Sequence, residues 1–316
     1  MSRNIIIGLL ILLGACAPEQ SKDFLFAANQ NDNSVSVLDA HTLTEVKRIA
    51  VGAKPIGLVA TGKRVFIADE TSGTVSVIDT ERLVLEKTLT TGAGTHDVVV
   101  TRDGTKIYAT NLNNDSLSVI DPITLSVKKI DLKPGTKPHA YGVNPATGEI
   151  WLANWGTNTI SILNDDMITA EIQTGKIPQH FIFTSDGNTV FATMGGDNQT
   201  WAYGVNSHEV KKKIDVPGPR PTFNMITPDD KYVLVSNTKG NQLTIIDPST
   251  NEVVKHLYVG NGPEHIIVTP DGKTAYVSIG EDDAIAVIDI ATLTMEKHVQ
   301  LASGSHPHGI ILVRTG

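Results

Sequence analysis

Residues 263–289 read PEHIIVTPDGKTAYVSIGEDDAIAVID, and this stretch decides the fold. An apolar run follows Pro263 and ends at the turn of residues 269–272, whose Asp-Gly pair supplies the positive φ angles that tight hairpins need. A second run at residues 276–278 is aromatic and β-branched, and a third at residues 285–289 alternates and ends in aspartate. These runs predict three consecutive antiparallel strands.

The same pattern recurs along the chain with a mean period of 42 residues. Its seven copies begin at Pro55, Thr95, Pro138, Pro178, Pro221, Pro263 and Pro307. A fourth, more polar run such as residues 252–260 completes each period, and no helical periodicity interrupts it. Four short strands in a period of 40 to 50 residues are typical of one blade of a β-propeller. The sequence therefore predicts an all-β, seven-bladed propeller with four-stranded antiparallel blades.

The ends of the repeat array are offset from the period. The first recognisable run, residues 24–29, matches a second strand, whereas the last run, residues 307–313, matches a first strand. We therefore expect residues 309–313 to pair with residues 24–28, which would close the ring and remove an exposed sheet edge. A closed ring makes residues 24–316 one domain.

Charge and composition exclude several classes of protein. The 316 residues carry 26 Lys and Arg against 34 Asp and Glu, a formal net charge of −8, so no overall basic field favours a nucleic-acid partner. The single cysteine excludes a disulfide bond within the chain and any multi-cysteine metal site.

The amino terminus has the features of a targeting segment. Arg3 precedes an apolar run over residues 5–13, which is about half a membrane span. Residues 13–16, Leu-Gly-Ala-Cys, resemble the lipobox of bacterial lipoproteins, in which the peptide is cut before a lipidated cysteine. The resemblance implies a signal peptide at residues 1–15, lipid attachment at Cys16 and a tether at residues 16–23. It implies a periplasm-facing envelope protein held by its lipid, and Ala17 favours the outer membrane.

The repeats also carry a family resemblance. The second strands, such as Tyr-Ala-Thr-Asn at residues 108–111, the Pro-Asp-Gly turn and the Val-Ile-Asp third strands resemble the YVTN-repeat family of seven-bladed propellers (YncE-like) over residues 24–313. Such a resemblance implies the scaffold rather than a particular activity. It is compatible with a monomer that has other envelope proteins as partners.

Histidines gather where each repeat starts. In propellers the first strand lines the central channel, and five of the seven repeats place a histidine at one of the two positions after the proline or its equivalent. With the residue that precedes the last proline, the candidate metal ligands are His96, His139, His180, His265, His306 and His308. Imidazole suits copper and zinc, and crowded imidazoles disfavour one another's protonation. Met194 would add a soft copper ligand, and the arrangement is similar to the copper-ligating propeller of nitrous-oxide reductase.

Two other interpretations of the channel mouth stay open. One is an organic or haem-type tetrapyrrole ligand, as the resemblance to haem-containing nitrite reductase propellers implies, with apolar walls from Tyr141, Trp155 and Phe223. Asp97 and Glu264 lie at the same positions as the histidines and are candidate acid or base groups. In the other interpretation, the histidines are a feature common to repeats of this family and form hydrogen bonds to neighbouring blades. The propeller would then be an interaction scaffold. Because no Gly-x-Ser-x-Gly or His-Glu-x-x-His motif occurs, we favour binding over catalysis.

Overall fold

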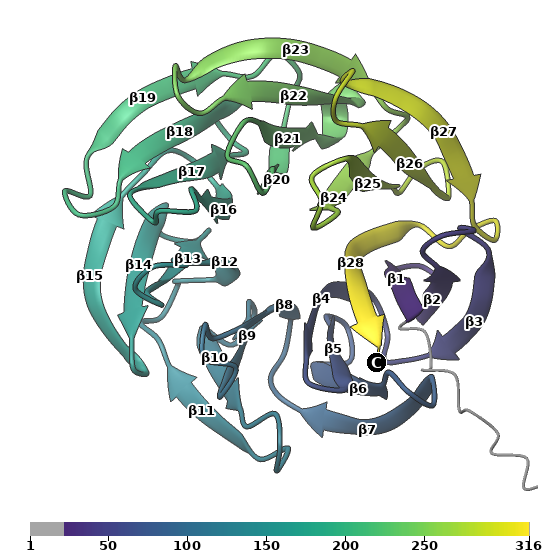
Figure 1. Ribbon diagram of the computed structural model, residues 1–316. Coiled ribbons are helices and arrows are strands. Elements are labelled where there is room, and N and C mark those ends of the chain that lie inside the picture. Colours follow the sequence, from purple (N-terminus) through teal and green to yellow (C-terminus); the bar gives the residue numbers. More distant parts are fainter. Residues whose placement is uncertain (1–21, 316) are drawn as a thin grey trace, which may run out of the picture.

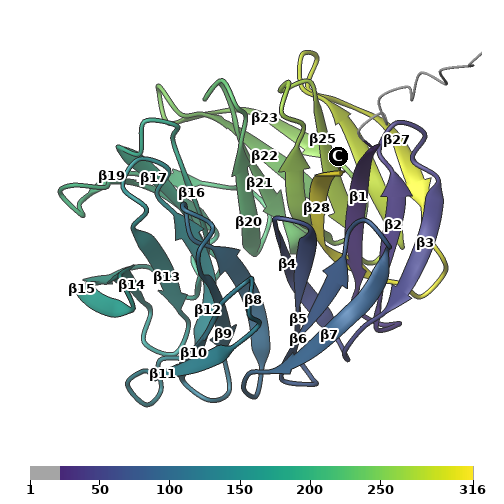
Figure 2. The same ribbon diagram turned by 60° about the horizontal axis from the view of Figure 1, so that its bottom comes forward.

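The computed structural model describes residues 22–315, and these form seven four-stranded antiparallel sheets arranged in a ring (Figure 1). The predicted signal peptide, Cys16 and most of the tether lie outside the described residues. Figure 2 shows the sheets standing side by side around the ring. The seven-bladed propeller predicted from the repeats is confirmed.

Each blade runs outward from the channel through four consecutive positions. The inner strands are β4 (Pro55–Thr61), β8 (Thr95–Val100), β12 (Pro138–Val143), β16 (Pro178–Phe183), β20 (Pro221–Ile226), β24 (Pro263–Val268) and β28 (Pro307–Thr315). The second strands are β1 (Lys22–Asn29), β5 (Arg64–Asp69), β9 (Ile107–Asn111), β13 (Ile150–Asn154), β17 (Thr189–Met194), β21 (Val233–Asn237) and β25 (Thr274–Ile279). The third strands are β2 (Ser34–Asp39), β6 (Thr74–Asp79), β10 (Ser116–Ile120), β14 (Thr159–Asn164), β18 (Gln199–Gly204), β22 (Gln242–Asp247) and β26 (Ala284–Asp289). The outer strands are β3 (Glu45–Ala50), β7 (Val84–Thr90), β11 (Val127–Asp131), β15 (Met167–Gln173), β19 (Val210–Asp215), β23 (Glu252–Tyr258) and β27 (Thr294–Gln300). One 3-10 turn, η1 (Thr238–Gly240), follows β21; each blade is named below by its inner strand.

The aspartate that ends most third strands shapes the turn to the outer strand. Asp79 is representative: its carboxylate accepts hydrogen bonds from the backbone N–H of Glu81 at 2.9 Å and of Arg82 at 2.8 Å. Leu83 completes the turn with φ of 53°. Because the carboxylate satisfies N–H groups that the sheet leaves free, aspartate at this position stops the strand and starts the turn.

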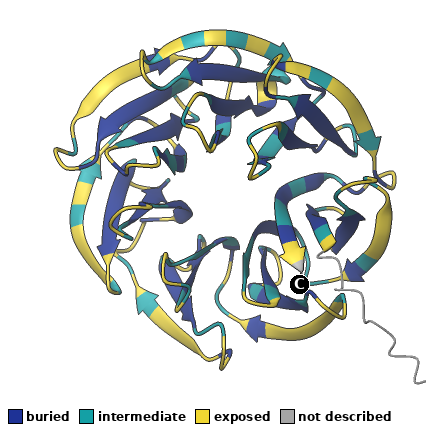
Figure 3. Cartoon of the chain, in the orientation of Figure 1, coloured by how far each residue is buried: buried dark blue, intermediate teal, exposed yellow. Residues whose placement is uncertain are grey.

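The core lies between neighbouring blades, in the layers of the inner three strands (Figure 3). Trp151 on β13 is fully buried and meets Phe181, Phe183 and Tyr203 of the next blade edge-on at 5.8 to 6.2 Å between ring centroids. Edge-on contacts between aromatic rings add stability beyond the apolar area that they bury. The outer strands are mostly exposed and carry polar side chains.

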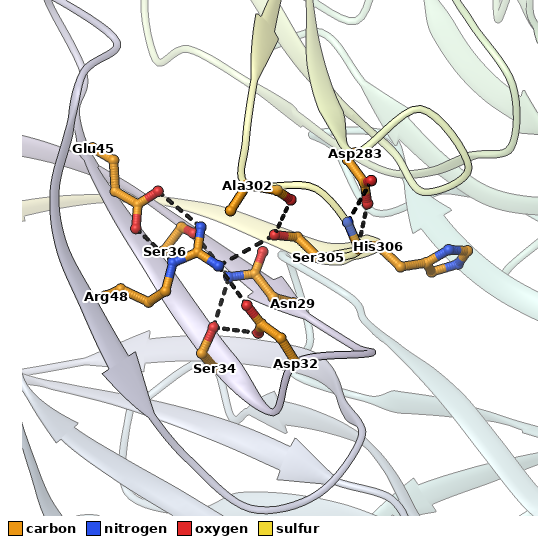
Figure 4. Close-up of polar contacts among 11 residues, drawn as sticks. Asn29, Asp32, Ser34, Ser36, Glu45, Arg48, Asp283, Ala302, Ser305 and His306 are labelled. Atoms are coloured by element: carbon orange, nitrogen blue, oxygen red, sulfur yellow. Dashed lines mark hydrogen bonds and ion pairs between the residues drawn. The ribbon is translucent and has the colours of Figure 1, made fainter.

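The ring closes where the two ends of the described chain meet. β1 pairs with β28 in the predicted register, with Phe24 opposite Val313 and Ala27 opposite Ile310. Side chains reinforce this closure: Arg48 of β3 contacts Glu45, Asp32 and the Ser305 hydroxyl, which lies just before β28 (Figure 4). Closure leaves β1 hydrogen-bonded on both edges.

Within residues 22–315, no helix has the length and apolar character needed to span a bilayer.

Candidate functional site

The channel mouth owes its side chains to an irregularity repeated in all seven inner strands. The pairing between each inner strand and the second strand shifts by one residue just after the strand begins, as between Pro138 and Tyr141 of β12. A shift of this kind places two consecutive residues on one face, where a regular strand would alternate them. The two positions are Ile56 and Gly57, His96 and Asp97, His139 and Ala140, Gln179 and His180, Thr222 and Phe223, Glu264 and His265, and His308 and Gly309.

These positions surround a cavity of about 400 Å³ at the end of the channel. This volume falls within the range of roughly 300–1,000 Å³ that is usual for small-molecule sites. Ten of the twelve residues predicted for the metal site and the channel mouth line the cavity: His96, Asp97, His139, Trp155, His180, Phe223, Glu264, His265, His306 and His308.

Tyr141 and Met194 do not line the cavity, although the sequence placed both there. Each is almost fully buried in the core. The Met194 sulfur accepts a hydrogen bond from the Thr174 hydroxyl at 3.1 Å, and the side chain packs between blades. The reason is strand alternation: the last residue of a second strand points into the blade rather than over the mouth.

Three stacked rings form one side of the cavity, here called the Phe223 arc. Phe223 lies between His180, at 3.8 Å between ring centroids, and His265, at 4.1 Å. The rings are nearly parallel, with interplanar angles of 27° and 21°. They come from the second of the two mouth positions on three successive blades, so the arc follows the curve of the channel wall.

A second group, the His139 arc, lies on the other side. His139 stacks on Trp155 at 3.8 Å with an interplanar angle of 17° and lies 4.1 Å from His96. His308 joins the two arcs, because its ring lies 4.9 Å from that of His265 and 6.5 Å from that of His96. The mouth is therefore walled by flat, polarizable rings over much of its circumference.

His96 is held by a contact with a carboxylate. Its Nδ1 lies 3.0 Å from a Glu70 carboxylate oxygen, and the Lys54 amine contacts the other oxygen at 2.8 Å. Burial by itself would raise the pKa of Glu70, but the hydrogen bond from His96, together with Lys54, lowers this pKa to about 2. A carboxylate at Nδ1 places the proton there, which leaves Nε2 as a basic acceptor.

Two further imidazoles have their Nδ1 atoms occupied. The Nδ1 of His180 lies 2.8 Å from the Asn224 amide oxygen, and the Asn224 NH₂ group is itself anchored to the Phe191 carbonyl. The Nδ1 of His139 lies 3.3 Å from the Gln179 carbonyl oxygen. Since both partners are acceptors, each Nδ1 is the donor and each Nε2 retains its lone pair.

Burial keeps four of the mouth histidines neutral. It lowers the pKa of His180 to about 4 and of His308 to about 3, and it holds the pKa of His139 and His265 well below the ordinary value. The neighbouring imidazoles add to the lowering at His139, His265 and His308. Neutral imidazoles can stack and can also bind a metal through a lone pair.

Two acidic residues line the same cavity in an unusually protonated state. Burial raises the pKa of Glu264 to about 7 and that of Asp97 to about 6. A Glu264 oxygen lies 3.6 Å from Nε2 of His308, and within the described chain Nδ1 of His308 is buried without a hydrogen-bond partner. A proton at the mouth is therefore held by a carboxyl group rather than by the adjacent imidazole.

The histidines do not converge on a point. Across residues 22–315, no group of three or more His, Cys, Asp or Glu side chains is arranged to hold a metal ion. Stacking explains this arrangement, because rings about 4 Å apart and nearly parallel present faces to one another rather than nitrogen lone pairs to a common centre.

Several residues of the mouth were missed by sequence reasoning. Glu70, Trp155 and Thr238 each follow the end of a second strand, whereas Lys54 and Arg220 each precede an inner strand. Only Trp155 was predicted. The signal that could have found the others is their register in the repeat, because the residue before each inner strand has a positive φ, as with Lys54 at 58° and Arg220 at 65°.

A family model and several solved structures match this chain. The model of the YNCE-like β-propeller matches residues 60–235 and 220–315. No curated protein matches the sequence.

Three solved structures illustrate the similarity of fold. Hydrazine synthase from Kuenenia stuttgartiensis is 17% identical with a TM-score of 0.76, over 85% of this chain and 92% of that one. A crystal structure from Bacteroides fragilis of a protein described as a 6-phosphogluconolactonase is 20% identical with a TM-score of 0.77, over 94% and 99%. Dihydro-heme d1 dehydrogenase NirN, in complex with DHE, is 16% identical with a TM-score of 0.65, over 91% and 74%. At these identities the likeness establishes the fold alone.

Proposed function

This chain belongs to the YNCE-like β-propeller family, and on that scaffold we propose that it is a membrane-anchored envelope protein that binds a planar conjugated small molecule, such as a haem-type tetrapyrrole, at the channel mouth. One observation carries the proposal. The Phe223 arc, the His139 arc and His308 put seven flat rings around a cavity of about 400 Å³. Flat faces of this kind bind flat ligands by stacking.

The neutral state of the imidazoles supports a conjugated ligand. A charged imidazolium would attract water into the cavity, whereas a neutral ring offers an apolar face and one lone pair. Three of the rings have Nδ1 occupied by a protein acceptor, which leaves Nε2 of each available to a ligand. Among them, Nε2 of His96 is the strongest electron-pair donor to a metal, because Glu70 accepts its Nδ1 proton.

A macrocycle fits this arrangement better than a bare ion. A free copper or zinc ion needs three or more donors that converge, whereas a metal already held by four ring nitrogens needs only one axial imidazole. The separated Nε2 atoms of the stacked rings can each supply one such axial ligand. The structural neighbour in complex with DHE, whose name refers to heme d1, supports this choice at the level of the fold.

The location in the proposal rests on the amino-terminal residues. Arg3, the apolar run and Cys16 support a lipid anchor, and a tether of a few residues would keep the propeller close to its membrane. A periplasm-facing channel mouth would meet small molecules and envelope proteins rather than nucleic acid.

The test is a titration of the full chain, purified in detergent, with metal-free protoporphyrin IX and with haemin. We expect both to bind, with a shifted Soret band and quenched tryptophan fluorescence. Trp155→Leu and Phe223→Leu should each weaken binding of both rings by about fivefold through lost stacking. His96→Phe keeps a flat ring at that position, so metal-free protoporphyrin should still bind while the axial-ligand shift of haemin disappears.

Tyr258→Leu, an exposed aromatic on the outer strand β23, is the matched control and should bind as the wild type does. Absence of any spectral change with either ring would overturn the proposal. Equimolar binding of Cu²⁺ or Zn²⁺ alone, lost in His139→Ala and His265→Ala, would instead identify the mouth as a metal site.

A further inference from the structure

A second cavity adjoins the channel mouth at the side, and the geometry points to this side groove as the binding site for an acidic substituent of the same ligand. The inference rests on the proposed function and specifies its ligand as a planar ring that carries an anionic arm. It concerns the face between the β12, β16 and β20 blades, which the stacked rings do not cover.

The side groove has a volume of about 410 Å³ and adjoins the mouth. Trp155, Gln179 and Arg220 line both cavities. The remaining lining residues of the groove are Lys137, Gly156, Ile177, Gly195, Asn198 and Pro219. A ligand stacked in the mouth would therefore lie next to the groove, and a substituent directed past the shared residues would reach it.

Charge distinguishes the groove from the mouth. The mouth is lined by four acidic residues, Glu70, Asp97, Glu264 and Glu281, whereas no described acidic side chain lines the groove. The groove does contain two cations, Lys137 and Arg220. Its electrostatic character therefore suits an anion.

Neither groove cation forms a close ion pair. Within residues 22–315, neither the Lys137 amine nor the Arg220 guanidinium lies within 4.0 Å of a carboxylate oxygen. Arg220 acts on Glu264 at longer range and lowers its pKa, although burial outweighs this effect. The other cations of the mouth differ: Lys54 contacts Glu70 at 2.8 Å and Lys239 contacts Glu281 at 3.8 Å. A guanidinium that is not in contact with a carboxylate, at the border of the two cavities, is well suited to bind one.

The backbone holds these cations at fixed places on the rim. Each is the residue with positive φ that precedes an inner strand, at 48° for Lys137 and 65° for Arg220. The Arg220 N–H donates to the Asn198 side chain at 2.9 Å, and the Lys137 carbonyl accepts from the Trp155 N–H at 3.1 Å. The backbone at the starts of β12 and β20 therefore places one cationic residue on each side of the groove.

Gly195 keeps this side of the groove open. The residue after the second strand is Glu70, Trp155 or Thr238 on three other blades, and each of these side chains borders the mouth, whereas the β24 blade also has a glycine there, Gly280. A Cβ at Gly195 would lie 2.7 Å from the Gln179 amide nitrogen, so a larger residue would displace Gln179 and narrow the passage.

Trp155, Ile177 and Pro219 supply the apolar part of the groove lining, and Ile177 is 42% exposed. An apolar lining beside two cations matches a short hydrocarbon arm that ends in a carboxylate. A ligand with a cationic arm would be repelled there.

The experiment compares protoporphyrin IX, which has two carboxylate arms, with its dimethyl ester, titrated into the full chain at the same low detergent concentration. We expect the acid to bind about tenfold more tightly than the ester, as expected for charge-assisted hydrogen bonds at a partly exposed site. Arg220→Gln and Lys137→Gln should each weaken binding of the acid by several-fold and leave binding of the ester unchanged. Added salt should weaken binding of the acid alone.

Lys87→Gln is the matched control, because it also removes one positive charge but lies on the exposed outer strand β7, outside both cavities. It should change neither affinity. Equal affinities of acid and ester for the wild type, or equal losses of both in Arg220→Gln, would overturn the inference and leave the proposed function intact. Failure of both compounds to bind the wild type would overturn both.

Discussion

Asp69 ends the second strand of the β4 blade, where Asn29, Asn111, Asn154 and Asn237 end the equivalent strands. In those blades the amide NH₂ group donates to hydroxyls of the adjacent third strand. At Asp69 the direction is reversed: the hydroxyls of the third strand donate to one carboxylate oxygen, while the other oxygen is buried without a partner in the described chain. Burial raises the pKa of Asp69 to about 6.

Asp69→Asn should stabilise the protein at neutral pH. The folded protein holds the Asp69 proton more tightly than the unfolded chain does, so the wild type loses stability as pH rises from about 4 to about 6. Asparagine carries no titrating proton, so the variant does not lose this stability. Its free energy of unfolding should exceed that of the wild type by about 2 kcal/mol above pH 6 and should differ little near pH 4. Urea unfolding at pH 4.5 and 8 measures the difference. The reciprocal Asn111→Asp should lose stability at pH 8, and an equal gain for Asp69→Asn at both pH values would refute the explanation.

At the scale of the strand, the repeat determined where elements begin but not which way their side chains point. All seven inner strands start at the predicted residues, from Pro55 to Pro307, because a residue with positive φ and usually a proline fix each start locally. The shift in pairing that turns two consecutive side chains to the channel depends on the neighbouring strand, so no local pattern signals it. Met194 was misplaced for a related reason: its departure from asparagine suggested a special role, but its position in the strand places it in the core.

Rim residues were harder to predict than the residues of the inner strands. The position before the inner strand holds Lys54, Lys137 and Arg220 in three blades, but glycine, isoleucine or histidine in the other four. A repeat preserves the backbone conformation there and leaves the side chain free to vary. The candidate site was therefore predictable in its histidines, which recur at the strand starts in most blades, and not in its cations, which fewer than half of the blades carry.

The closing strand β28 is the element on which the ring depends most. It supplies the inner strand of a blade whose other three strands come from the opposite end of the described chain. Without β28, β1 would present an unpaired edge, and Leu25, Phe26 and Ala27 would lose the cover of Ile310 and Ile311.

Removal of residues 306–316 should abolish cooperative unfolding and cause aggregation. Differential scanning calorimetry of the truncated chain measures this. A synthetic peptide of residues 303–316 should restore a cooperative transition by adding a strand to the exposed edge. Arg314→Ala, which removes only the exposed contact with Asp23, is the control and should cost less than about 1 kcal/mol. A truncated chain that unfolds at the wild-type temperature would show that closure is dispensable.

For the whole molecule, the channel mouth joins two sets of groups whose titrations oppose each other. The buried histidines have lowered pKa values, so on acidification the unfolded chain takes up protons that the folded protein refuses, and stability falls. The carboxyls of Asp97 and Glu264 have raised pKa values, so on acidification the folded protein takes up protons first, and stability rises. Between about pH 4 and 6.5 these contributions offset each other, and the titrations are coupled through shared neighbours.

Substitution of one mouth histidine should therefore change the pH dependence of the free energy of unfolding in a definite direction. His265→Phe keeps a flat ring in the Phe223 arc, because Phe223 occupies the same position of the neighbouring blade. The variant no longer loses stability when the unfolded chain is protonated, so its free energy of unfolding relative to wild type should rise by about 1 to 2 kcal/mol between pH 8 and pH 5. Urea unfolding at both pH values measures the change. Phe223→His adds an imidazole to the same arc, so its free energy of unfolding relative to wild type should fall between pH 8 and pH 5. Only a titrating group can make such a difference depend on pH. A difference from wild type that is the same at both pH values, in either variant, would therefore contradict the role assigned to the buried imidazoles.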